Sequence, residues 1–244
     1  METSEYKNIY ESEEEHFYYR SVHDLILTLC GKYLPQREPL QILDAGCGTG
    51  GLALKLQQFG AVSAVDMHEE ALKFSRQRGV DSVEGSVENL PFEDNRFDLV
   101  TSVDVIYHKA VKDDVEALRQ FARVLKSQGI LIMRVPARPE LFSSHDQLVW
   151  TERRYKRREL TKKLKAAGLK PLQVSYCHSP LYLPALAKTS LEKPTGTKPH
   201  SGVSETSALV NEICTNVLKL ESKLLSLGVA MPIGLGLMAV ARKA

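Results

Sequence analysis

Apolar residues along the chain follow two patterns, short continuous runs and longer stretches in which they recur every three or four positions. The short runs predict buried strands, and the longer stretches predict helices that end at glycine or proline. Strands are expected at residues 40–43, 61–65, 80–83, 97–103, 129–135, 172–176 and 234–242. Helices are expected at residues 15–30, 52–59, 69–78, 113–125, 157–167 and 210–227. Because strands and helices alternate, the pattern predicts an α/β fold with a doubly wound, mostly parallel sheet.

The last third of the chain adds a loop and an unusual helix. Residues 188–207 are rich in proline, glycine, serine, threonine and lysine, which predicts a mobile surface loop. The helix that follows carries one apolar stripe, which we expect to pack on the sheet. A dimer contact or docking on a membrane surface stays open for the same stripe. It consists of Val210, Ile213, Val217, Leu220, Leu224 and Leu227.

Composition excludes several protein classes without naming a partner. The net charge is only +2, from 32 basic and 30 acidic side chains. The four cysteines lie far apart without a Cys-x-x-Cys pair, so no metal site is expected and a reducing, cytoplasmic location fits best. The acidic start is opposite to the basic start of a secretory signal. The longest apolar stretch, residues 229–241, is too short to span a bilayer, although peripheral membrane contact stays open.

A glycine-rich loop, DAGCGTG at residues 44–50, follows the first expected strand. Gly46, Gly48 and Gly51 match the Gly-x-Gly-x-x-Gly pattern of dinucleotide enzymes, and Asp66 follows at the distance of a ribose-binding acid. Asp44 distinguishes between a dinucleotide and S-adenosylmethionine as the ligand. A carboxylate at the mouth of the loop repels a pyrophosphate but attracts the ammonium and sulfonium of S-adenosylmethionine. The loop therefore favours S-adenosylmethionine, with Asp66 accepting hydrogen bonds from the ribose hydroxyls. An NAD-dependent oxidoreductase is the alternative.

Residues 42–50 (ILDAGCGTG) resemble the first motif of class I S-adenosylmethionine-dependent methyltransferases, which have a seven-stranded Rossmann-like sheet. Three later segments agree with that family in order and spacing, namely residues 83–92 (VEGSVENLPF), 96–108 (RFDLVTSVDVIYH) and 121–136 (FARVLKSQGILIMRVP). The resemblance implies an enzyme that transfers a methyl group and releases S-adenosylhomocysteine. A non-catalytic protein that binds S-adenosylmethionine is a further alternative.

The resemblance also divides the single domain, residues 1–244, into four parts. It implies an N-terminal capping helix in residues 1–36, a cofactor-binding core in 37–136, an acceptor-side insertion and loop in 137–205, and a C-terminal helix and last strand in 206–244.

Residues 16–20 (HFYYR) resemble the capping helix of a methyltransferase subgroup, in which an arginine lies over the methionine end of the cofactor. Arg20 would then hold the cofactor carboxylate, while a surface arginine above core aromatics is the alternative. Ser86 stands where many relatives carry an aspartate, which shifts the expected adenine contact towards the Val87 backbone. The cofactor-binding residues implied are Tyr18, Arg20, Asp44, Gly46, Gly48, Gly50, Asp66, Met67, Ser86, Val87 and Val103.

Methyl transfer is an in-line displacement, so alignment of the reactants and exclusion of water can supply most of the catalysis. A hydroxyl acceptor would benefit from a general base. His108, at the carboxyl end of the fourth strand, is the first candidate, and His145 in the insertion is the second. A structural hydrogen-bonding role is the alternative for each histidine.

The acceptor is expected to be a small-molecule or lipid-linked metabolite, methylated at oxygen or nitrogen by a monomer or homodimer. Basic residues gather in 153–165, where a solvated helix face is the first interpretation and an anionic acceptor or a membrane surface the second. No RNA-binding accessory domain is visible, and aromatic residues do not interleave with the basic ones. Nucleic acid is therefore not expected as a partner.

Overall fold

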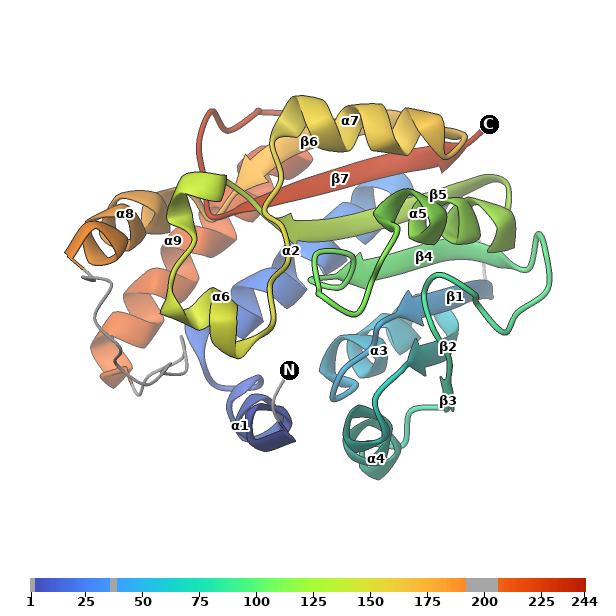
Figure 1. Ribbon diagram of the computed structural model, residues 1–244, viewed down its shortest axis with the longest axis horizontal. Coiled ribbons are helices and arrows are strands. Elements are labelled where there is room, and N and C mark those ends of the chain that lie inside the picture. Colours follow the sequence, from blue (N-terminus) through green and yellow to red (C-terminus); the bar gives the residue numbers. More distant parts are fainter. Residues whose placement is uncertain (1–2, 36–38, 192–205) are drawn as a thin grey trace.

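The computed structural model describes residues 3–35, 39–191 and 206–244. Within these residues, seven strands form one sheet in the order β3-β2-β1-β4-β5-β7-β6 (Figure 1). Their bounds are β1 Leu40–Ala45, β2 Gly60–Asp66, β3 Ser82–Glu84, β4 Phe97–Val103, β5 Leu125–Pro136, β6 Leu169–Cys177 and β7 Gly236–Lys243. The pairs among β1 to β5 are parallel, and β7 runs antiparallel to both β5 and β6. The predicted doubly wound, mostly parallel α/β sheet is confirmed.

Helices cover both faces of this sheet. They are α1 Thr3–Ser12, α2 Phe17–Tyr33, α3 Gly51–Leu56, α4 Glu69–Gln77, α5 Asp114–Val124, α6 Ser144–Leu148, α7 Arg157–Ala166, α8 Tyr182–Leu191 and α9 Ala208–Ser226. Short 3-10 turns occupy Gln57–Phe59, Pro139–Leu141 and Ser179–Leu181. Within the described residues, no helix has the length and apolar character needed to cross a bilayer.

The strands are apolar on both faces because each face has its own core. Along β5, Ile130 and Ile132 pack with α2, α3 and α9, whereas Leu131 and Met133 pack with α5 and α7. Side chains of successive strand residues point to opposite faces, so burial on both faces produces a continuous apolar run. This is the reason that short apolar runs located the strands correctly.

Helix α1 was missed by the sequence analysis. Its aromatic side chains pack against the edge of the α4 layer, where Tyr10 stacks on Phe74 at 4.7 Å between ring centroids and Tyr6 lies 5.8 Å from His68. Such contacts join residues far apart in the sequence, and isolated helices of this length are marginal in water. The helix therefore depends on tertiary packing that no local pattern records.

The loop expected at residues 188–207 is only partly testable. Residues 188–191 belong to α8, which corrects the first part of that prediction. Residues 192–205 lie outside the described residues.

The apolar stripe of α9 is placed differently from the expectation. Helix α9 turns Leu218 and Leu225 inward, together with Thr215, Glu221 and Ser222. The predicted stripe residues are exposed, from 36% at Leu224 to 79% at Leu227. Packing of the stripe on the sheet is therefore wrong, because the inner face of α9 is built from the residues between the stripe positions.

Candidate functional site

A cavity of about 580 Å³ opens at the carboxyl ends of β1, β2, β4 and β5. Parallel α/β sheets place ligands at this edge, where the strand order reverses. Here β1 leads outward to β2 on one side, and β4 lies on its other side. Helices α1, α2, α6 and α8 contribute side chains to the remaining walls, so the cavity extends well beyond the glycine-rich loop.

The glycine-rich loop forms one wall through positive backbone torsions. Gly46 has φ +82°, and a Cβ there would overlap the side chain of Val105. Gly48 has φ +53°, and an added Cβ would meet nothing within 4 Å. Gly48 therefore leaves an open cradle in which a ligand can approach the backbone.

Gly50 does not line the cavity, and its expected cofactor contact stays a prediction. It precedes α3 with φ +84°, and a Cβ there would lie 2.9 Å from the Cα of Ser75. Its role is to let the loop pack closely against α4.

Two buried carboxylates flank the loop. Asp44 is 2% exposed and accepts a hydrogen bond from Thr101 Oγ1 at 2.7 Å. Burial raises the pKa of Asp44 to about 7, against the lowering effect of the Thr101 bond. Asp66 accepts one bond from the Gly48 N–H and one from the His68 N–H, each at 3.0 Å, and burial raises its pKa as well. A cation or a hydrogen-bond donor that enters the cavity would therefore stabilise the ionised form of either carboxylate.

Of the residues expected around the nucleoside, three line the cavity and one does not. Met67, Val87 and Val103 line the cavity, and Gly85 joins them. Ser86 does not, because its Oγ turns to accept a bond from the Glu88 N–H at 3.2 Å within its own turn. The adenine contact predicted for Ser86 therefore stays a prediction, with the Oγ–H still available as a donor.

Helix α2 presents Tyr18, Tyr19, Val22 and His23 to the cavity. These positions lie on the side of α2 that faces the cavity, and Arg20 lies off that side. Arg20 is exposed and does not line the cavity, whereas Tyr18 does. The predicted cofactor contacts of both residues stay predictions.

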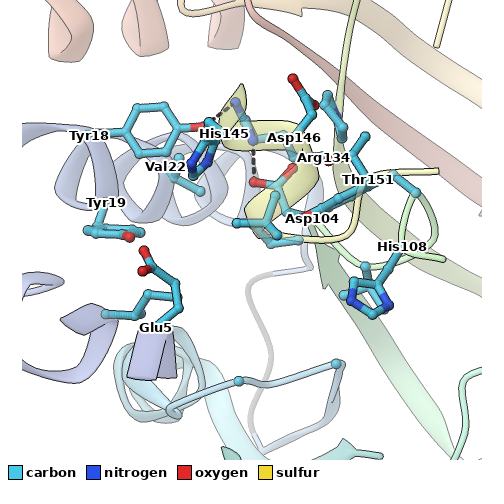
Figure 2. Close-up of a pocket in the computed structure, with 18 of the residues that line it drawn as sticks. Glu5, Tyr18, Tyr19, Val22, Asp104, His108, Arg134, His145, Asp146 and Thr151 are labelled. Atoms are coloured by element: carbon cyan, nitrogen blue, oxygen red, sulfur yellow. Dashed lines mark hydrogen bonds and ion pairs between the residues drawn. The ribbon is translucent and has the colours of Figure 1, made fainter. Parts of the chain in front are cut away.

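A buried arginine is among the residues that line the cavity. Arg134, at the end of β5, is 2% exposed, forms an ion pair with Asp104 and donates a hydrogen bond to Tyr18 Oη at 2.9 Å (Figure 2). Asp104 follows β4 with φ +54°, which turns its side chain towards Arg134. The ends of β5 and β4 and helix α2 thus bring Arg134, Asp104 and Tyr18 together in one cluster. The sequence analysis assigned no role to Arg134 or Asp104.

His108 lies in the wall of the cavity, on the turn after β4 (Figure 2). Burial lowers its pKa to about 4. Its Nδ1 accepts a hydrogen bond from the Ala110 N–H at 3.1 Å, which assigns the ring proton of the neutral form to Nε2. The neutral ring therefore presents Nε2–H as a donor, and its use as a general base stays a prediction.

His145 also lines the cavity, on α6, near Tyr18 in the view of Figure 2. Burial lowers its pKa, so it is neutral at physiological pH. The adjacent Asp146 is 1% exposed and caps α6, and Arg154 binds both of its oxygens at 2.9 Å. This pair fixes the segment that carries His145.

The basic residues 153–165 are less available than the sequence suggested. Arg154 pairs with Asp146, and Lys163 lies 2.7 Å from the buried Asp114, which Arg153 approaches to 3.5 Å. Three members of the group therefore neutralise buried acids. These three charges are therefore not available to bind an anionic acceptor.

Two acids of the N-terminal segment were also missed. Glu13 is 4% exposed, accepts a bond from Thr49 Oγ1 at 2.7 Å and pairs with Arg78 at 2.6 Å. Glu5 on α1 is 6% exposed and points towards Tyr19 in Figure 2. Both line the cavity. The spacing of Tyr6, Ile9 and Tyr10 is the one sequence signal that could have placed this segment in a helix.

Comparison with known proteins agrees with these features. A family model described as a methyltransferase domain matches residues 43–133. The ubiquinone/menaquinone biosynthesis C-methyltransferase UbiE of Pseudomonas entomophila is 35% identical over 111 residues, covering 41% of this chain and 43% of its own. A human protein named "Probable tRNA methyltransferase 9B" is 29% identical over 154 residues, covering 61% of this chain and 33% of its own. The matches thus span less than half the length of these relatives.

A similar fold is found in a solved structure from Thermotoga maritima, described as an S-adenosylmethionine-dependent methyltransferase. It has a TM-score of 0.63 at 20% identity and covers 99% of this chain and 95% of its own. The antiparallel β7 between β5 and β6 also differs from the 3-2-1-4-5-6 order of dinucleotide-binding sheets, which disfavours the NAD alternative.

Proposed function

We propose that this chain, whose residues 43–133 match a methyltransferase-domain model and whose fold is similar to that of a solved S-adenosylmethionine-dependent methyltransferase, methylates an oxygen or nitrogen of a small-molecule or lipid-linked acceptor. When bound, S-adenosylmethionine supplies an electrophilic methyl group and leaves as S-adenosylhomocysteine. The proposal concerns the acceptor, since the relatives named above act at a quinone-pathway carbon or carry the name of a tRNA enzyme.

The residues around the glycine-rich loop fit this cofactor. The open cradle at Gly48 admits a ligand to the backbone, and Asp44 presents a buried carboxylate suited to a cationic group. Asp66 keeps lone pairs beyond its two backbone bonds, which suits ribose hydroxyls. Met67 and Val87 supply apolar surface for the base.

The walls of the cavity beyond the glycine-rich loop support the acceptor proposal. Side chains from α2, α6 and α8 contribute to them, and so do Arg134, Asp104 and Tyr18. Such a chamber favours a compact group that is surrounded on several sides over an extended polymer. A lipid-linked acceptor would place its reacting head group there.

In this proposal the chain acts by orientation and by exclusion of water. Arg134 holds Tyr18 and Asp104 in fixed positions, so the acceptor meets polar groups with little freedom to move. His108 contributes its Nε2–H as a hydrogen-bond donor to the acceptor. This role does not require a basic side chain.

The test is transfer of label from methyl-labelled S-adenosylmethionine to fractionated native metabolites, with the product identified by mass spectrometry. We expect label in a small-molecule or lipid fraction, and none with Asp66→Ala as the binding-deficient control. Label in the RNA fraction would contradict the proposed acceptor and would indicate methylation of RNA instead. Tight binding without transfer to any fraction would favour the non-catalytic alternative.

A further inference from the structure

The carboxylate of Asp104 has hydrogen-bonding capacity that the protein does not use. Asp104 lines the cavity, and 27% of its side chain is exposed. Arg134 pairs with one carboxylate oxygen, Oδ2, whereas Oδ1 has no hydrogen-bond partner among the described residues. Because an ionised carboxylate can accept about four hydrogen bonds, Asp104 can still bind a donor that enters the cavity.

The position of Asp104 is fixed by its neighbours. Its backbone N–H donates to the Arg134 carbonyl at 2.9 Å, and its side chain pairs with the guanidinium of the same residue (Figure 2). Gly236 on β7 makes room for that guanidinium, because a Cβ there would lie 2.8 Å from Arg134 Nε. Asp104 itself has φ +54°, and left-handed torsions of this kind concentrate at functional sites. The carboxylate is therefore held ready rather than placed by chance.

Two tyrosine hydroxyls accompany this carboxylate. Tyr18 Oη accepts a hydrogen bond from Arg134 at 2.9 Å, and its own hydrogen has no acceptor in the part of the chain that the structure describes. Tyr107 also lines the cavity, and its hydroxyl bonds no described group. Burial raises the pKa of both hydroxyls, so both stay protonated and can donate. Among the charged groups, Asp104 has the largest effect on the Tyr107 hydroxyl, so the two lie near each other.

The charges in this part of the wall compensate one another. Asp104 is paired with Arg134, and Asp146 is paired with Arg154 at 2.9 Å. Burial lowers the pKa of His145, so its ring is neutral at physiological pH. A charged acceptor would lose its hydration here without meeting an opposite charge of its own. An uncharged polar acceptor loses less and finds hydrogen-bond partners.

We propose that the acceptor is an uncharged compound that carries a reacting hydroxyl and a second oxygen close to it. The reacting hydroxyl donates its hydrogen bond to the Asp104 carboxylate, and Tyr18 and Tyr107 donate to the second oxygen. A lone pair of the reacting oxygen then stays available for the methyl carbon. This inference rests on the proposed function and names the class of acceptor for the same cavity.

Asp104 is also the group that takes the proton of the reacting hydroxyl. As the oxygen–carbon bond forms, the carbon–sulfur bond breaks and its electron pair stays on sulfur. The O–H bond of the acceptor breaks, its proton passes to Asp104, and the carboxylic acid later releases it to water. The sulfonium and the carboxylate both become neutral, so charge is balanced. His108 is less suited to this step, because its Nδ1 accepts the Ala110 N–H at 3.1 Å and its Nε2 carries the ring proton.

The first test identifies the atom that receives the methyl group. The full chain is incubated with methyl-labelled S-adenosylmethionine and native small-molecule and lipid extracts, and the labelled product is isolated. Hot hydriodic acid releases the methyl group of an ether as methyl iodide, mild alkali releases that of an ester as methanol, and an N-methyl group resists both. We expect release by the acid and none by the alkali. Mass spectrometry should show a second oxygen near the methylated one.

The second test uses variants with the labelled fraction as substrate. Tyr107→Phe should raise the apparent KM about five- to twentyfold with little change in kcat, because the lost bond is made to the acceptor alone. Its unfolding temperature should equal that of the wild type. The matched control is Tyr10→Phe, whose ring stacks on Phe74 outside the cavity and whose KM should be unchanged. Asp104→Asn should lower kcat at least about 100-fold, while calorimetry with S-adenosylhomocysteine shows an unchanged cofactor site.

The outcomes separate this inference from the proposed function. Label on nitrogen or in an ester would overturn the inference and leave the proposed function standing. Label only in added RNA, or none in either extract, would overturn both. An ether product whose KM and kcat are the same in wild type, Tyr107→Phe and Asp104→Asn would overturn the roles of the two residues. If Asp104→Asn does not fold, the product chemistry and Tyr107→Phe still decide.

Discussion

Replacing Asp44 by asparagine removes the carboxylate proposed to attract the cationic part of the cofactor, while it keeps an oxygen for the Thr101 hydrogen bond. Burial raises the pKa of Asp44 from 3.8 to about 7. At about 1.4 kcal/mol per pH unit, ionisation of this group costs roughly 4 kcal/mol more in the cavity than in water. A bound cation must offset that cost, so the affinity depends on pH.

The raised pKa of Asp44 determines how the stability of the fold and the cofactor affinity depend on pH. A carboxyl with a raised pKa stabilises the fold most below its unfolded value of 3.8, and this contribution is lost as pH rises to about 7. Cofactor binding has the opposite dependence, because it needs the ionised form. At pH 6 about nine tenths of Asp44 is protonated, so the affinity for S-adenosylmethionine should be about tenfold weaker than at pH 8.

The assay is titration calorimetry at pH 6 and pH 8 in buffers of different ionisation enthalpy. We expect binding of S-adenosylmethionine at pH 6 to release about one proton from Asp44 in the wild type. The release attributable to this group should be absent in Asp44→Asn, whose affinity at pH 8 should fall by about 1.5 to 3 kcal/mol. The exposed Asp81→Asn is the control. An affinity that is equal at both pH values, with the same proton release in wild type and variant, would refute the role of Asp44.

Three further predictions test other parts of the site. Gly46→Ala should destabilise the protein by about 1 to 3 kcal/mol in thermal unfolding, because its Cβ overlaps Val105 and its φ is positive. Gly48→Ala has no overlap but likewise a positive φ, so it should cost about 1 kcal/mol and lose cofactor affinity in calorimetry as well. His108→Ala should lower turnover with nearly constant cofactor affinity, and since the His108 pKa is about 4, the wild-type rate should show no titration of this group between pH 6 and 8. Arg154→Leu should cost about 3 to 5 kcal/mol in denaturant unfolding, because it leaves the buried Asp146 unpaired, and a loss below about 1 kcal/mol would contradict this.

Local patterns were sufficient for the sheet and the glycine-rich loop. The strands are short apolar runs buried on both faces, and the loop has a torsional requirement at Gly46 that only glycine meets without strain. Both constraints leave a mark in the local sequence, as a run of apolar residues or as a glycine. They can therefore be recognised in one chain.

The remaining parts of the site depend on contacts between distant residues. Arg134 acquires its place through Asp104 and Tyr18, the latter 116 positions away, and nothing around it in the sequence marks it as buried. Arg20 looked suitable by type but lies off the cavity face of α2 by its helical phase. The apolar stripe of α9 was recognised, yet periodicity alone could not tell which side of the helix faces the sheet.

The most direct measurement of the central claim is methyl transfer itself. Purified protein is incubated with methyl-labelled S-adenosylmethionine and separate small-molecule, lipid, RNA and protein fractions, in parallel with Asp66→Ala. We expect label in the small-molecule or lipid fraction, formation of S-adenosylhomocysteine, and loss of both in the variant. Label confined to RNA or protein, or no transfer despite tight cofactor binding, would contradict the claim that this chain methylates a compact acceptor in its enclosed chamber.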